Sequence, residues 1–134
     1  MAGKRTDEGE HRSLDILYGA QALDTTLYLG LYENNTEPAE AAALTDLTEQ
    51  AVATGYARIA LTRGTWSITA DHADYAEQTF TANGGDWGNQ YGYFICTVAS
   101  GTAGILIYVE DFSDGPYDVT DGDSVKVTPK ITAT

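Results

Sequence analysis

The chain has 134 residues, the size of one domain, and its hydrophobic fraction of 43% is that of a globular protein rather than a disordered one. It carries 20 acidic and 7 basic residues, and the formal net charge of −13 disfavours binding to nucleic acid or to anionic membranes, which are themselves negative. A single cysteine excludes an intrachain disulfide, and no apolar run is long enough to span a membrane.

Residues 1–12 are almost wholly polar and predict a flexible arm, or a segment that becomes ordered only against a partner. No apolar stretch follows their basic residues, so we expect no secretion signal and synthesis in a cytosol. Ser13 is placed as a helix N-cap, and a short helix over 13–23 is predicted by the helical spacing of Leu14, Leu17, Tyr18 and Ala22. Because Gly19 weakens this helix, we expect it to need a surface to dock on.

Strand patterns dominate from Thr25 onward. The segment "TTLYLGLY" alternates, with its leucines on one face, and residues 40–54 allow one or two helical turns. Further alternating runs follow, separated by turn signals such as Gly64, Asp114-Gly115-Pro116 and Asp121-Gly122. About eight strands result. They predict one mainly β domain over 13–134, an antiparallel β-sandwich that is jelly-roll-like, or a small barrel.

Two of these runs, "QYGYFICTV" and "ILIYVE", are apolar on both faces, whereas a half-exposed strand would alternate. The second face needs a cover, and two covers remain open: the helix over 13–23 or another subunit. Arg58, one of the few cations, pairs with an acid either at such an interface or on the surface. The interface residues that we predict are therefore Leu14, Leu17, Tyr18, Arg58, Tyr91 and Tyr93.

Acidic residues are concentrated in "DFSDGPYDVTDGDSVKV", which contains Asp111, Asp114, Asp118, Asp121 and Asp123. Their spacing is not that of a calcium-binding loop, which alternates acids before a glycine and ends in a distant glutamate. Aspartates are common turn formers, so we favour turns between strands over an ion site. A weak calcium site between loops stays open as the alternative.

Catalytic groups are sparse. His11 lies in the polar arm and His72 in a turn, no nucleophile motif accompanies either, and Cys96 lies among apolar neighbours where a thiol is usually inert. Glu77 and Glu110 are the only acids inside strands, and solvent-facing edge positions explain both better than a pair for glycoside hydrolysis. We therefore expect no enzyme, no catalytic residues, no metal ligands and no cofactor.

The aromatic residues raise carbohydrate binding as another class of function. Trp87 lies in the glycine-rich stretch "NGGDWGNQ", where a lectin would place a side chain that stacks on a sugar ring. The alternative, which we favour, is that Trp87 fills the end of the sandwich, as large aromatic side chains commonly do.

The order of four segments resembles a group of small virion proteins of tailed bacteriophages, described as head decoration (cement) or tail-associated proteins. The segments are "TTLYLGLYENNTEP", "TGYARIALTRGTWSIT", "YAEQTFTANGGDWGNQYGYFICT" and "GILIYVEDFSDGPYDVTDGDSVKVTPKI". The resemblance covers about residues 13 to 132, and its specificity comes from the order and spacing of the motifs. Residues 39–49 depart from it, being longer and more helical.

The resemblance implies a non-enzymatic structural protein of the virion, assembled in the host cytoplasm, most simply a capsid decoration protein. Its partners would be the major capsid protein or another virion protein and further copies of itself as a homo-oligomer. The acidic charge suits an outer surface. A tail or baseplate protein, or a carbohydrate-binding module for host attachment that uses Trp87, stay open as alternatives.

Overall fold

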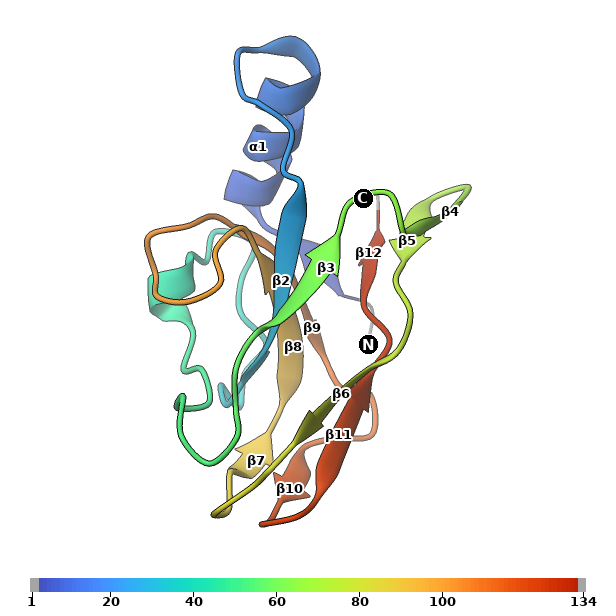
Figure 1. Ribbon diagram of the computed structural model, residues 1–134. Helices are drawn as coiled ribbons and strands as arrows, with labels where there is room; N and C mark the ends of the chain where they lie inside the picture. The colour runs from blue at the N-terminus through green and yellow to red at the C-terminus, as the bar shows by residue number, and fades with distance from the viewer. Residues whose placement is uncertain (1–2, 133–134) are drawn as a thin grey trace.

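The computed structural model describes residues 3–132 and shows a mainly β chain with one α-helix near the N-terminus (Figure 1). Helix α1 spans Asp7–Tyr18, and the 3-10 helix η1 spans Leu44–Asp46. The strands are β1 Lys4–Arg5, β2 Thr26–Tyr32, β3 Ile59–Thr62, β4 Ser67–Thr69, β5 His72–Asp74, β6 Gln78–Thr81, β7 Gly88–Gln90, β8 Gly92–Cys96, β9 Leu106–Asp111, β10 Tyr117–Val119, β11 Ser124–Val127 and β12 Lys130–Thr132. Within 3–132, no helix is long and apolar enough to cross a membrane.

The structure confirms a mainly β, antiparallel fold with one N-terminal helix, but it has twelve strands in the described range rather than about eight. Three predicted strands are each divided, at residues 75–77, at Tyr91 and at residues 128–129. At the last of these, Pro129 supplies no N–H for a ladder hydrogen bond. The short strand β1 is the other addition.

The strands form four antiparallel sheets. The largest has the order β1-β9-β8-β2-β3, beside a three-stranded sheet β12-β5-β4 and the pairs β11-β6 and β10-β7. One core cluster joins the five-stranded sheet to the smaller ones. It includes Leu29, Leu31, Ile95, Phe80, Val125 and Val127, each at most 3% exposed. The alternation in β2 and β11 that the sequence shows thus corresponds to side chains directed into this core.

The second apolar face of β8 and β9 is covered by the chain's own connection between β2 and β3. Phe94, Cys96, Leu106 and Val109 are fully buried there, in a cluster that includes Ala42 and Leu44. Neither cover that the sequence left open is therefore needed. The segment around η1, whose role was open, supplies the apolar side chains that a second subunit would otherwise have provided.

The N-terminal segment also differs from the expectation, and residues 1–2 of the predicted arm lie outside the described residues. Helix α1 begins at Asp7 rather than after Ser13, because Thr6 is its N-cap and accepts a hydrogen bond from the Gly9 N–H at 3.0 Å. The Thr6 hydroxyl also donates to the Leu106 carbonyl, and β1 pairs with β9. The acids at the start of α1 favour the helix through its dipole. Residues 4–9 of the predicted arm are therefore held on the sheet.

Gly9 sets how closely α1 approaches β9. A Cβ atom at this position would lie 2.6 Å from the Ile107 carbonyl oxygen and 2.9 Å from its Cα, both backbone atoms. In an exposed helix Gly9→Ala would stabilise by about 1 kcal/mol. Here we expect the opposite, a loss of about 1–3 kcal/mol in unfolding free energy, because the backbones must separate. Chemical denaturation measures it.

His11→Ala is the matched control, because His11 is exposed on the same helix. It should leave stability unchanged or raise it slightly through helix propensity. A Gly9→Ala protein as stable as the His11→Ala protein would show that α1 does not depend on this close approach.

Candidate functional site

Helix α1 presents a row of apolar side chains to solvent. Leu14, Leu17 and Tyr18 are 59%, 70% and 83% exposed, and their spacing places them on one face of the helix. Exposed Asp7, Glu10 and His11 continue the same face toward the N-terminus. We call these six residues the outer stripe of α1. The helix stands beyond the sheets at one end of the molecule (Figure 1), so the stripe lies on a projecting element.

An apolar groove borders the other face of α1. It encloses about 440 Å³ and lies between the helix, the chain that leads into β2, and the sheet β12-β5-β4. Its apolar lining consists mainly of Ile16, Leu23, Leu27, Trp66, Ile68 and Ile131. Ile68 is 76% exposed on β4, an edge strand of its sheet. Single exposed apolar residues are ordinary, but a lined groove beside an exposed stripe is typical of an interaction surface.

The groove also gathers positive charge on an acidic protein. Arg5, Arg12 and Arg63 line it against two aspartates, Asp24 and Asp71, whereas the whole chain has 7 cations and 20 acids. Arg12 holds Asp24 at 2.6 Å, and this contact, through a hydrogen bond and the charge of Asp24, raises the pKa of the Arg12 guanidinium. The described residues place no carboxylate within 4 Å of Arg63, which is exposed.

This groove was not predictable from the sequence pattern. Leu14, Leu17 and Tyr18 were predicted as interface residues, and their exposure leaves them available for that role. The groove residues come from segments that lie far apart in the sequence. No local pattern in the β4–β5 hairpin indicates that β12 pairs with β5. The only sequence signal was Ile68 itself, an apolar residue in a short, otherwise polar strand.

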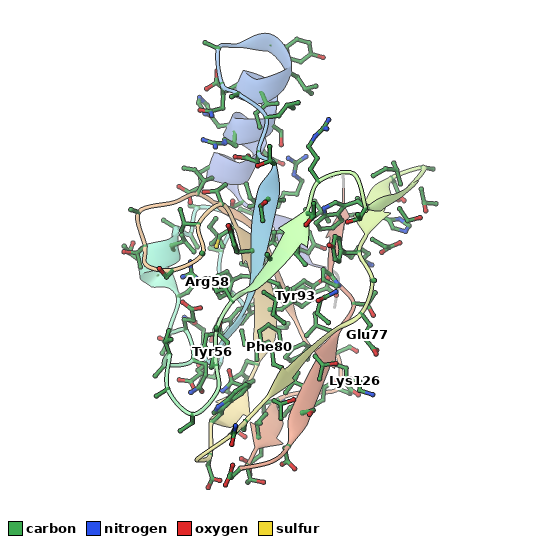
Figure 2. The ribbon with its side chains drawn as sticks, viewed as in Figure 1. Tyr56, Arg58, Glu77, Phe80, Tyr93 and Lys126 are labelled. Carbon is green, nitrogen blue, oxygen red and sulfur yellow. The ribbon has the colours of Figure 1, made fainter. Side chains whose placement is uncertain are left out.

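Arg58 lies inside the chain rather than at an interface. Its side chain is 3% exposed and forms two hydrogen bonds with Glu49, at 2.7 and 2.9 Å. It also donates to the carbonyls of Val98 and Gly101, each at 2.9 Å, and lies over the ring of Phe94. The predicted intermolecular or surface pairing is therefore wrong, because the charge is satisfied by the chain's own loops (Figure 2).

The two predicted interface tyrosines are also used within the chain. Tyr93 is 5% exposed and belongs to the first core cluster, and its hydroxyl donates to Glu110 at 3.0 Å (Figure 2). Tyr91 is half-buried against the second cluster, and its N–H donates to the Tyr32 carbonyl. Tyr93 is thus not a surface residue of the single chain, since it lies beneath the smaller sheets.

Trp87 is a residue of the hydrophobic core and not a surface residue that could contact a sugar. It is 5% exposed, its indole N–H donates to the Thr54 carbonyl at 2.9 Å, and its ring meets Tyr56 edge-on at 5.6 Å. A buried ring has no free face for a sugar, so the burial of Trp87 agrees with the filling role that we favoured and contradicts the alternative of a sugar contact at Trp87.

Three aspartates of the acidic stretch, Asp114, Asp121 and Asp123, lie in turns between strands, as the favoured interpretation predicted, whereas Asp111 belongs to β9 and Asp118 to β10. Asp123 accepts hydrogen bonds from the N–H and the hydroxyl of Thr120, and these bonds lower its pKa. Asp121 accepts from the Gly84 N–H, and Asp114 from the Tyr117 hydroxyl. Within residues 3–132, no group of three or more His, Cys, Asp or Glu side chains is arranged to hold a metal ion.

Asp111 and Glu110 belong to a group of buried tyrosine hydroxyls and acids. Tyr32 donates to Asp111 at 2.5 Å, and Tyr93 and Tyr108 both donate to Glu110. Burial is the main cause that raises the pKa of Tyr108 to about 12, and it also raises those of Tyr32 and Tyr93. These hydroxyls therefore remain protonated and act as donors that hold the acids in place.

Glu37 is a further acid near this group, and its side chain is almost fully buried. Its side chain is 6% exposed, Lys4 Nζ lies 3.7 Å from Oε1, and neither carboxylate oxygen has a hydrogen-bond partner among residues 3–132. Burial raises the pKa of the Glu37 carboxyl; Lys4 opposes this shift, while the negative charges of Asp111 and Glu110 add to it. Its ionised form is thus disfavoured in the folded protein.

Glu37→Gln is expected to raise the melting temperature at pH 7 to 8. Since the folded pKa is raised, the wild-type carboxyl contributes stability below its ordinary pKa, and this contribution is lost as the pH rises through the raised value. The neutral amide avoids that loss, so the two proteins should differ least near pH 4. Melting curves across this range test it. Glu40→Gln, at an exposed acid, should show no such pH-dependent difference.

The groups that the sequence considered for catalysis lie apart. Cys96 is fully buried, and burial raises the pKa of its thiol, which keeps it protonated. His72 lies between Asp71 at 2.8 Å and Asp74 at 3.1 Å on the β4–β5 hairpin. His11 is exposed on α1, and Glu77 is exposed at the side of the molecule (Figure 2). The described residues bring no two of these four together.

Comparison with known proteins leaves the family open. No model of a known protein family matches the chain, and no curated protein matches it.

Proposed function

We propose that this chain is a non-enzymatic structural protein of a bacteriophage virion, a capsid decoration (cement) protein that packs against the capsid protein and its own copies. The observation that carries the proposal is the outer stripe of α1. Three large apolar side chains are exposed on a projecting helix, while the apolar strands behind it are covered by the chain's own segments. Such a distribution favours contacts made through one edge of the molecule.

For the architecture, we propose a β-sandwich with jelly-roll-like connections. Its support is the core cluster that side chains from β2 and β8 share with side chains from β6 and β11. Two layers that share one apolar core are the basis of sandwich folds. The twelve strands differ from the usual eight because several are divided by short breaks.

In this role, many weak contacts act together. A shell offers many equivalent positions, so a small protein that touches both the shell and its neighbours gains strength from multivalency. Helix α1 supplies the exposed apolar contact, and the net charge of −13 favours an outward-facing surface over one that faces packaged DNA. The protein would be located in the virion after assembly in the host cytoplasm.

Cryo-electron microscopy of virus particles from the source of the gene tests this function. Density for the β domain on the capsid lattice, with α1 reaching a neighbour, is the expected result. Density at the tail alone would replace decoration with the tail or baseplate alternative. Absence from every particle would overturn the virion proposal.

The carbohydrate-binding alternative can be tested at the same time on a glycan array. With Trp87 buried, binding would have to use another aromatic side chain, such as the half-buried Trp66. Binding to a host glycan, together with absence from particles, would favour that alternative.

A further inference from the structure

Two unpartnered surfaces lie on opposite faces of α1. Leu14, Leu17 and Tyr18 of the outer stripe are exposed, whereas Arg12, Ser13 and Ile16 of the same helix line the groove. The helix therefore forms one wall of an apolar groove and presents an apolar ridge on its other side. Each copy of the chain carries both a ridge and a groove.

We propose that the outer stripe of α1 on one copy docks in the groove of the next copy. This inference rests on the proposed function, because it names the surface through which decoration proteins would contact each other. An amphipathic helix that places side chains at i, i+3, i+4 and i+7 into an apolar groove is a recurring mode of protein recognition. The groove volume of about 440 Å³ suits a few large side chains rather than a folded domain.

Charge selects a copy of this chain as the occupant. The stripe begins with Asp7 and Glu10, and the last turn of α1 contains no basic residue. The groove has three arginines against two aspartates on a chain of net charge −13. The acidic end of the stripe therefore meets a part of the molecule where arginines are concentrated, and on a chain of net charge −13 this favours the contact over one between two acidic surfaces.

The placement of the two surfaces also determines the symmetry. In a two-fold dimer each stripe would enter the partner's groove, so the stripe and the groove of one copy would both have to face the same partner. Here the two surfaces lie on opposite faces of α1, so the contact is head-to-tail. After each contact one groove and one stripe remain free, and assembly proceeds to a ring or an open chain.

Single substitutions at exposed positions test the contact without disturbing the fold. Leu17→Glu removes an apolar residue from the stripe, and Ile68→Glu removes one from the groove; the two wild-type side chains are 70% and 76% exposed. In light scattering across a concentration series, wild type should form species larger than two chains. Each variant should self-associate at least about tenfold more weakly, because an apolar contact is replaced by a charge.

Val52→Glu is the matched control. Val52 is 74% exposed and lies outside both the stripe and the groove. This variant should assemble as wild type does, and melting curves should show that all three variants remain folded. Equal loss of assembly in the Val52→Glu protein would overturn the proposal, since the effect would then come from added charge alone.

Mixing the two variants gives the sharpest result. The Leu17→Glu protein retains an intact groove and the Ile68→Glu protein an intact stripe, so an equimolar mixture should form a species of two chains while each alone is monomeric. A head-to-tail contact requires this complementation. If the mixture forms no complex, the inference is overturned. It is also overturned if the wild-type protein is monomeric at about 100 µM although its groove is open and binds an apolar dye.

The two proposals can fail separately. Wild-type protein that is monomeric in solution and whose copies do not touch on the capsid would overturn the helix-to-groove contact alone. Head-to-tail assembly in solution by a protein absent from every virus particle would support the contact and overturn the virion function.

Discussion

Replacing Arg58 with alanine is expected to lower the free energy of unfolding by about 3–5 kcal/mol. The Arg58 side chain is 3% exposed, and its guanidinium joins the segment before β3 to the loop between β8 and β9 through Val98 and Gly101. Breaking one partner of a largely buried pair has a large cost because the groups left behind lose hydrogen bonds that water restores only in part.

Glu49 carries most of that penalty. It accepts two hydrogen bonds from Arg58 and a third, at 2.6 Å, from the Tyr56 hydroxyl, which in turn accepts from the Leu31 N–H. Without the guanidinium, Glu49 keeps only the tyrosine among these partners. The contact of Arg58 with the Phe94 ring is lost as well.

Chemical denaturation of the Arg58→Ala protein measures the loss, with Arg12→Ala as the control. Arg12 also holds an aspartate at 2.6 Å, but the Arg12 side chain is 23% exposed against 3% for Arg58, while the two acids, Asp24 and Glu49, are similarly exposed at 19% and 22%. Exposed pairs contribute about 1 kcal/mol or less. Similar losses in the two variants would show that burial of the Arg58 pair contributes nothing beyond an ordinary surface contact.

Turns were the part of the fold that the sequence predicted best, because a turn depends on neighbouring residues. Asp123 caps the turn at Thr120, and Gly122 adopts a positive φ of 90°, which favours glycine. Both follow from "TDGD" alone. The alternation that predicted β2 and β11 is equally local, since successive side chains of a strand point to opposite faces.

Contacts between distant segments were not predictable in the same way. The pattern of β8 indicated that both faces are buried, which is correct, but it did not identify the covering residues. Leu44 and Ala42 lie about fifty residues earlier in the chain, in a segment with little regular structure. Arg58 was likewise expected to pair with another molecule, because nothing local pointed to Glu49.

The helix shows how a correct pattern led to a wrong placement. Leu14, Leu17 and Tyr18 have helical spacing, and sequence analysis assigned them to a surface that needs a partner, while it left residues 1–12 as an arm. The structure docks the polar half instead, through the small Gly9 and the capping Thr6. Close backbone approach can hold a helix on a sheet where few apolar side chains are available.

Leu44→Ala is expected to lower the free energy of unfolding by about 2–5 kcal/mol, although Leu44 lies in a long connection rather than in a sheet. The side chain is 3% exposed and packs in the cluster that contains Phe94 and Cys96. If a second subunit covered this face, truncation of Leu44 would have little effect on the isolated chain. Denaturation measures the loss, and Val52→Ala, at an exposed position nearby, should remain within about 0.5 kcal/mol of wild type.

The single cysteine distinguishes local opening of this cover from general destabilisation. Cys96 is fully buried in the same cluster as Leu44, whereas Val125 belongs to the other core cluster. We therefore expect Cys96 to react faster with a thiol reagent under native conditions in the Leu44→Ala protein than in the Val125→Ala protein. The two reaction rates are compared under conditions that give both proteins the same free energy of unfolding. Equal rates in the two variants would mean that Cys96 reacts only after global unfolding, so that the connection and the sheet open as one unit.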